Sequence, residues 1–135
     1  MYEEIERLRP LSFPGTDVFV ICIPAVLAWE SMFKDTIDKF YTDEICRCGF
    51  EDVPVILAKM MVDEETEENV DKQWKREEVA ECRDRVGWLH CCEVSVEQPS
   101  LVTELVQWIA FAGLDERNKR RVNKSGDKRS KCTLL

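Results

Sequence analysis

The sequence contains no long hydrophobic run and no apolar leader. Its longest stretch without a charged residue, Val18–Trp29, is 12 residues long and contains Pro24. A membrane-spanning helix needs about 20 apolar residues. The first ten residues, MYEEIERLRP, are acidic and lack the apolar core of a signal peptide. We therefore expect neither a transmembrane segment nor an export signal.

Internal repeats are also missing, and the composition is that of an ordinary folded protein. Hydrophobic residues make up 44% and charged residues 34% of the 135 positions. A composition of this kind excludes wholesale disorder. The length is sufficient for one domain with a single core and too short for two.

The net charge of −8 conceals a division between two parts of the chain. Residues 1–116 carry a net charge of −15, whereas residues 117–135 carry +7. We predict a folded domain over 1–116 and a disordered basic tail over 117–135. The acidic body should repel nucleic acid, and the tail should be attracted to anionic membranes. A nucleic-acid-binding tail is the alternative that the acidic body disfavours.

Seven cysteines and one histidine raise the question of a metal site. The residues with suitable side chains are Cys46, Cys48, His90, Cys91 and Cys92. Neighbouring residues of a strand point to opposite faces, so the adjacent pair would not easily share one ion. We expect reduced thiols packed in or near the core and no metal site.

Three short apolar runs predict strands: Val18–Ile23, Val53–Ala58 and Trp88–Ser95. The first two lack polar alternation, which is typical of parallel strands covered on both faces. Pro54 fits near the start of its strand.

Helical patterns alternate with these strands. One stripe at helical spacing comprises Trp29, Met32, Phe33, Thr36, Ile37 and Phe40. A second helix, over about 75–86, buries Val79, Cys82 and Val86 and ends at Gly87. The third begins with Ser100 as N-cap, ends at Gly113, and turns inward Leu101, Leu105, Trp108, Ile109 and Ala112. This order predicts an α/β fold.

The last four residues, Cys132-Thr133-Leu134-Leu135, match the C-a-a-X prenylation signal. A terminal leucine favours a geranylgeranyl group on Cys132. One lipid anchors a protein weakly, and a preceding basic segment supplies the second signal. We therefore predict membrane binding through the lipid and the basic tail.

The segment ERLRPLSFPGTDVFVIC, residues 6–22, resembles "YDRLRPLSYPxTDVFLICF" of Rho-family small GTPases. The basic C-a-a-X end and the order of elements are similar as well. The resemblance implies a truncated three-layer fold of the P-loop GTPase type, with a mainly parallel sheet of about three strands. It also implies GTP or GDP with magnesium as the family's ligands, and a molecular switch in signal transduction as its function.

Several motifs of that family have no counterpart here. No segment matches the P-loop G-x-x-x-x-G-K-[ST], and the first-switch threonine that completes the magnesium site is missing. The position of the catalytic glutamine falls on Tyr2, which cannot orient a water molecule. We predict weak nucleotide binding, no hydrolysis and no catalytic residue. The strand that would neighbour 18–23 belongs to the missing part, so we expect a free sheet edge.

Degraded base-recognition motifs imply four guanine-contacting positions: Met61, Asp63, Ser95 and Val96. Asp63 matches the carboxylate that binds guanine, and Met61 stands where the family has lysine. Ser95 matches, and Val96 replaces an alanine. Asp63 is equally the first charge of an acidic loop, DEETEENVD.

Arg7, Leu8 and Arg9 fall in the family's second switch and imply a surface for regulators or effectors of Rho GTPases. The implied location is the cytoplasmic face of membranes, with a cytosolic pool. The alternative reading is a non-catalytic prenylated module that binds partners at membranes. Without a nucleotide phosphate to sense, the second-switch segment is either a fixed surface or a frayed one.

Overall fold

The computed structural model describes residues 2–61 and 73–133. The elements follow in the order α1 (Tyr2–Leu8), η1 (Arg9–Ser12), β1 (Phe19–Pro24), α2 (Met32–Ile37), η2 (Asp38–Cys46), β2 (Val55–Met60), α4 (Arg76–Val86), β3 (His90–Val94) and α5 (Pro99–Thr133). η1 is a 3-10 helix, and η2 is a π-helix that continues α2. Within these two ranges, no helix is both long and apolar enough to cross a membrane.

The sheet has three parallel strands in the order β1-β2-β3. Phe19 lies opposite Val55, and Ile56 lies opposite His90. The predicted strands are confirmed, with boundaries displaced by up to two residues. β1 pairs only with β2 in the described sheet, so β1 is an edge strand as predicted.

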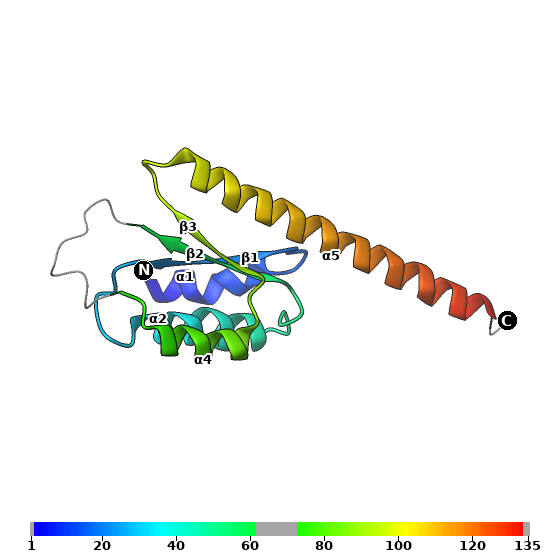
Figure 1. The fold of residues 1–135 in the computed structure, drawn as a ribbon. Coiled ribbons are helices and arrows are strands. Elements are labelled where there is room, and N and C mark those ends of the chain that lie inside the picture. Colours follow the sequence, from blue (N-terminus) through cyan, green and yellow to red (C-terminus); the bar gives the residue numbers. More distant parts are fainter. Residues whose placement is uncertain (1, 62–72, 134–135) are drawn as a thin grey trace.

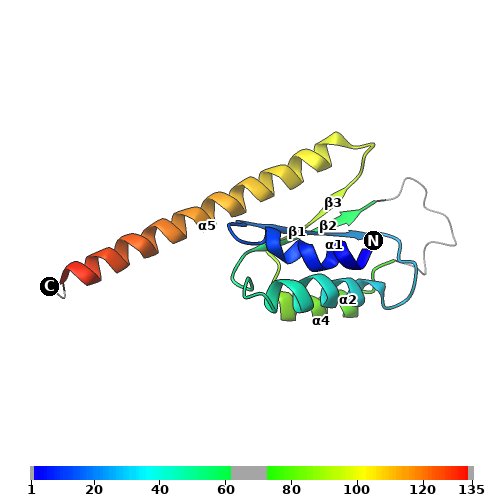
Figure 2. The same cartoon turned by 180° about the vertical axis from the view of Figure 1, so that it is seen from behind.

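Helices cover both faces of the sheet, which confirms the three-layer α/β prediction. Figures 1 and 2 show α1, α2 and α4 on one face and α5 alone on the other. Alternate residues of the central strand serve the two layers: Leu57 belongs to the core under α2 and α4, and Ile56 to the core under α5. Because both faces of β2 are buried, all of its central residues must be apolar, which explains the continuous apolar run in the sequence.

The larger core is built by α2 and η2. Their buried side chains, Phe33, Ile37, Tyr41 and Ile45, recur every four residues and so lie along one helix face. Trp29, which the sequence analysis assigned to this stripe, is 55% exposed. It precedes the helix, and its indole Nε1 donates a hydrogen bond to Asp35 at 2.9 Å.

The helix α4 confirms its prediction closely. Cys82 is buried, and Val79 and Val86 pack against the same core. The helix ends at Gly87, whose φ of 64° places it in the left-handed region. Glycine adopts this conformation at little cost, and it closes the last turn through a hydrogen bond from its N–H to the carbonyl of Arg83.

The structure differs from the prediction along α5. The helix begins at Pro99, a residue suited to the first helical position, so Ser100 lies inside it and is not the N-cap. It does not end at Gly113 either. Its backbone continues to Thr133, through the segment for which the sequence predicted a disordered tail. No proline follows Pro99, and lysine and arginine favour helix, so nothing in the composition forces an earlier end.

Candidate functional site

The carboxyl ends of the strands are where the resemblance places a guanine site. The backbone N–H of Met61 donates a hydrogen bond of 2.8 Å to the carbonyl of Val94. The structure thus brings Met61, after β2, beside Ser95, after β3. Asp63 lies outside the described residues.

Ser95 serves the turn that leads into α5. It is buried, with 7% of its surface exposed, and its Oγ accepts a hydrogen bond from the N–H of Glu97 at 3.3 Å. Its carbonyl accepts another from the N–H of Gln98 at 3.2 Å. Val96, at the tip of this turn, is 92% exposed. The two predicted positions after β3 therefore face different surroundings, one internal and one at the surface.

Trp74 packs against the carboxyl end of β1, a contact that the sequence did not predict. Its indole Nε1 donates a 2.7 Å hydrogen bond to the carbonyl of Pro24, and its ring lies 4.7 Å from that of Phe33. The ammonium group of Lys59 lies 5.2 Å from the same ring. The only available signal was an aromatic residue at the end of a polar segment, which does not identify a contact partner.

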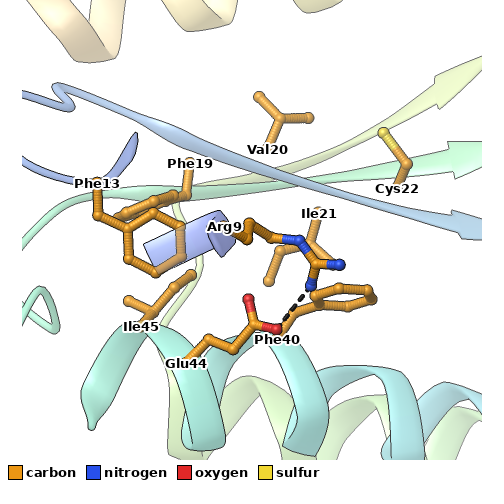
Figure 3. A pocket seen from close by; sticks show the side chains of 9 residues that line it. All are labelled: Arg9, Phe13, Phe19, Val20, Ile21, Cys22, Phe40, Glu44 and Ile45. Carbon is orange, nitrogen blue, oxygen red and sulfur yellow. Dashed lines mark hydrogen bonds and ion pairs between the residues drawn. The ribbon is translucent and has the colours of Figure 1, made fainter. Parts of the chain in front are cut away.

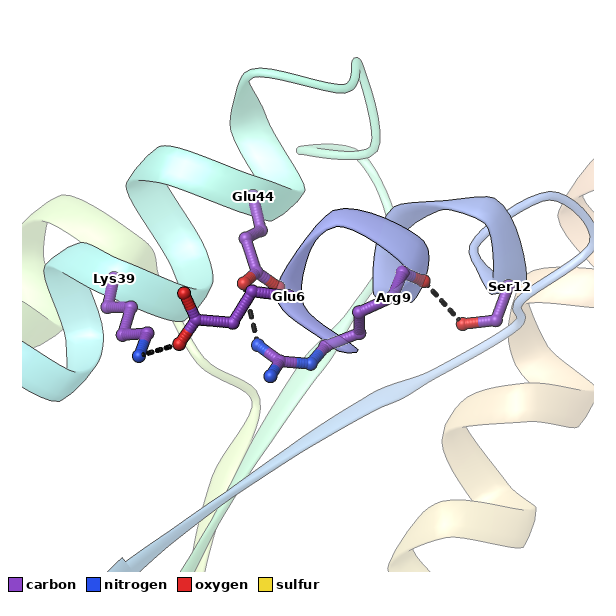
Figure 4. Close-up of polar contacts among 5 residues, drawn as sticks. All are labelled: Glu6, Arg9, Ser12, Lys39 and Glu44. Atoms are coloured by element: carbon purple, nitrogen blue, oxygen red, sulfur yellow. Dashed lines mark hydrogen bonds and ion pairs between the residues drawn. The ribbon is translucent and has the colours of Figure 1, made fainter. Parts of the chain in front are cut away.

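The second-switch-like segment, α1 with η1, is attached to α2–η2 by ion pairs (Figure 4). Arg9 donates to the carboxylate of Glu44 at 2.6 Å, and its guanidinium lies 4.8 Å from the centre of the Phe40 ring. One turn earlier, Glu6 pairs with Lys39. The lysine lowers the pKa of Glu6, first through the hydrogen bond and then through its charge. These contacts hold α1–η1 against α2–η2 in the structure.

The three predicted partner-binding residues consequently divide into two groups. Arg7 is exposed, and Leu8 exposes 62% of its surface. Arg9 is half-buried and occupied by Glu44. Ile5 and Leu11 are also exposed, at 53% and 75%. The outer surface of α1–η1 therefore carries exposed apolar side chains beside Arg7 and the exposed acidic residues Glu3 and Glu4, and Arg9 lies beneath it.

A groove of about 300 Å³ lies between the free edge of β1 and η2 (Figure 3). Aromatic and aliphatic side chains form most of its wall, and the Arg9–Glu44 pair lies in it. Its lining residues are Arg9, Phe13, Phe19, Val20, Ile21, Cys22, Phe40, Glu44 and Ile45. The free edge was predictable from the sequence, but the groove beside it was not, because the groove depends on how η1 and η2 pack.

The cysteines whose side chains the structure describes do not assemble into a ligand set. In residues 2–61 and 73–133, no three His, Cys, Asp or Glu side chains are placed to hold a metal ion. Cys91 is exposed and Cys92 is buried on opposite faces of β3, as the strand periodicity predicts. Burial raises the pKa of both thiols, which favours their protonated form. Cys132, the predicted lipid site, lies near the end of α5.

Comparison with known proteins supports the resemblance seen in the sequence. No protein-family model matches the chain. The chain is 25% identical over 142 residues to the GTP-binding protein RHO1 of Eremothecium gossypii, covering 98% of this chain and 67% of that protein. It is 24% identical to the GTP-binding protein Rho1 of Kluyveromyces lactis, covering 98% and 66%. The chain is thus distantly related, over nearly its whole length, to Rho-type small GTPases. It spans about two thirds of the length of these relatives.

Proposed function

We propose that this chain is a Rho-related signalling protein that binds regulators or effectors through α1–η1 while attached to the cytoplasmic face of membranes, with a cytosolic pool. The observation that carries the proposal is the attachment of α1–η1 to α2–η2 by the Glu6–Lys39 and Arg9–Glu44 pairs. A second switch normally depends on nucleotide for its order. Here the protein itself supplies contacts that fix the surface.

Guanine nucleotide binding is proposed to be weak, and hydrolysis absent. The phosphates of GTP require a glycine-rich loop with lysine, and magnesium requires hydroxyl and carboxylate ligands. The sequence contains no such loop, and the described residues offer no metal-binding cluster. The residues present therefore do not fit magnesium-bound GTP.

Titration with a fluorescent guanine nucleotide tests this part of the proposal. We expect a dissociation constant weaker than micromolar and no phosphate release from GTP above the uncatalysed rate. Sub-micromolar binding would overturn it. Met61→Lys restores the residue that the family has over the base, so it should strengthen any residual binding. Ala28→Lys, which places a lysine at an exposed position outside the base-recognition motifs, is the control.

Membrane attachment is proposed to use a geranylgeranyl group on Cys132 together with the basic segment. In cells, Cys132→Ser should move most of the protein from the membrane fraction to the cytosol. Cys48→Ser, which changes an exposed cysteine elsewhere, should leave the distribution unaltered. Equal membrane fractions for wild type and Cys132→Ser would contradict the lipid anchor.

The alternative, a purely non-catalytic partner-binding module, rests on the exposed α1–η1 surface. Purified regulators and effectors of Rho GTPases can be tested for binding to the chain without added nucleotide. Arg7→Ala with Leu8→Ser should weaken such binding at least about tenfold. Exposed positions on α4, changed as Glu81→Ala with Arg83→Ala, provide the control. Binding that requires GTP would favour the nucleotide switch over this module.

A further inference from the structure

The helix α5 carries large apolar side chains on both of its sides near the sheet. Toward the sheet it packs Leu105, Trp108, Ile109 and Ala112. Four further large apolar side chains, which we call the outer face of α5, are exposed: Val102 at 40%, Val106 at 57%, Phe111 at 59% and Leu114 at 63%. Thr103, Glu104 and Gln107 are exposed on the same helix, so the side away from the sheet is amphipathic, with large apolar side chains among polar ones. The outer face therefore indicates an interaction surface.

The charge of α5 changes abruptly where this outer face ends. Glu104 is the only charged residue from 99 to 114. Asp115 and Glu116 follow, and 117–135 carry a net charge of +7, which gives +5 for 115–135. In the sequence, Arg117 and Arg121 follow Leu114 by three and seven residues. Lys119 is exposed and pairs with Asp115 at 3.1 Å.

The direction of α5 separates this basic segment from the acidic body. Figures 1 and 2 both show the helix continuing well past the sheet to its end. With 35 residues and a rise of about 1.5 Å each, α5 is about 50 Å long. An anionic surface can therefore contact the basic segment while the body, with its net charge of −15, stays at a distance.

We propose that α5 lies in the plane of an anionic lipid bilayer, with Phe111 and Leu114 inserted at the boundary between headgroups and acyl chains. Adjacent apolar and cationic residues on one helix are the features of interfacial helices. The charge of the segment is complementary to anionic lipid, which decides the occupant. The inference deepens the membrane location given under Proposed function, but it requires neither the lipid on Cys132 nor a nucleotide.

The test uses the full chain with Cys132→Ser, so that prenylation plays no part. Flotation with vesicles containing about 30% phosphatidylserine in phosphatidylcholine should recover the protein, and pure phosphatidylcholine should not. Phe111→Ser with Leu114→Ser should lower the partition coefficient about tenfold or more, because two large apolar side chains no longer insert. Ile5→Ser with Leu11→Ser removes two apolar residues of comparable exposure from α1–η1 and should leave the partition coefficient unchanged.

Two results of the vesicle experiment would overturn the inference. One is no binding to the anionic vesicles. The other is unchanged binding of the Phe111→Ser, Leu114→Ser variant, which would assign attachment to charge alone.

Phe111→Trp keeps a large apolar side chain at position 111 and adds a tryptophan to the chain. The additional fluorescence, measured as the difference from the parent protein, should be quenched by brominated lipid. Light scattering without lipid measures the oligomeric state. A dimer that Phe111→Ser with Leu114→Ser dissociates would assign the outer face to a second copy of the chain. Failure of either kind leaves the nucleotide and Cys132 experiments unaffected.

Discussion

Arg9 and Glu44 form a 2.6 Å ion pair that joins η1 to η2 beneath the free edge of β1. The two residues are 35 positions apart in the sequence, so the pair fixes the relative position of two elements. The exposed side-chain fractions are 31% for Arg9 and 13% for Glu44, and the guanidinium also lies over Phe40. This pair is therefore sheltered enough to contribute to stability, which most surface pairs do not.

Glu44→Gln should lower the free energy of unfolding by about 1–2 kcal/mol, because Arg9 is left half-buried without its counter-charge. Urea denaturation measures the change. The matched control lies in the same helical region: Arg47 and Asp43 are 3.7 Å apart and largely exposed, so Asp43→Asn should cost less than about 0.5 kcal/mol. Equal costs for the two substitutions would contradict the sheltered pair.

Substitution of Glu6 should alter stability in a pH-dependent way. Its pKa is lowered below the ordinary 4.5 by Lys39, so the folded state favours the carboxylate. The stabilisation is complete above pH 4.5 and is lost as the pH falls through the lowered pKa. The stability difference between wild type and Glu6→Gln should accordingly be constant near neutrality and shrink in acid. Denaturation midpoints across this range measure it, and a difference that grows in acid would contradict the pair.

The fold was largely predictable because its signals are local. Continuous apolar runs identified the strands, and Gly87 marked the end of α4. The ion pairs of Glu6 and Arg9 were not predictable, because nothing in a sequence indicates which of 27 acidic residues meets a given arginine. The prediction that the last helix ends at Gly113 was wrong for a related reason. Glycine often ends a helix, but whether it does depends on its backbone conformation and on what surrounds it.

Tyr41 should lose its proton only at high pH, and the free energy of unfolding should fall as the pH rises above 10. It is 8% exposed, and its pKa is raised to about 12, first by burial and then by its hydrogen bond with Cys46. The folded state favours the neutral phenol, so its contribution is complete below the ordinary value of 10 and is lost as the pH rises toward 12. Ultraviolet absorbance should show one late tyrosinate step that Tyr41→Phe removes. A wild-type chain in which both tyrosines titrate near 10 would exclude the buried phenol.

Replacing two glycines by alanine should have opposite effects. At Gly87, φ is 64°, and nothing lies within 4 Å of an added Cβ, so the cost is purely conformational, about 1–2 kcal/mol. At Gly113, inside α5, an added Cβ would lie 3.6 Å from Cγ2 of Val18, an ordinary contact. Alanine favours helix over glycine by about 1 kcal/mol, so Gly113→Ala should stabilise. Urea denaturation of both variants measures the two signs. Destabilisation by Gly113→Ala would show that α5 is interrupted there, as the sequence alone had suggested.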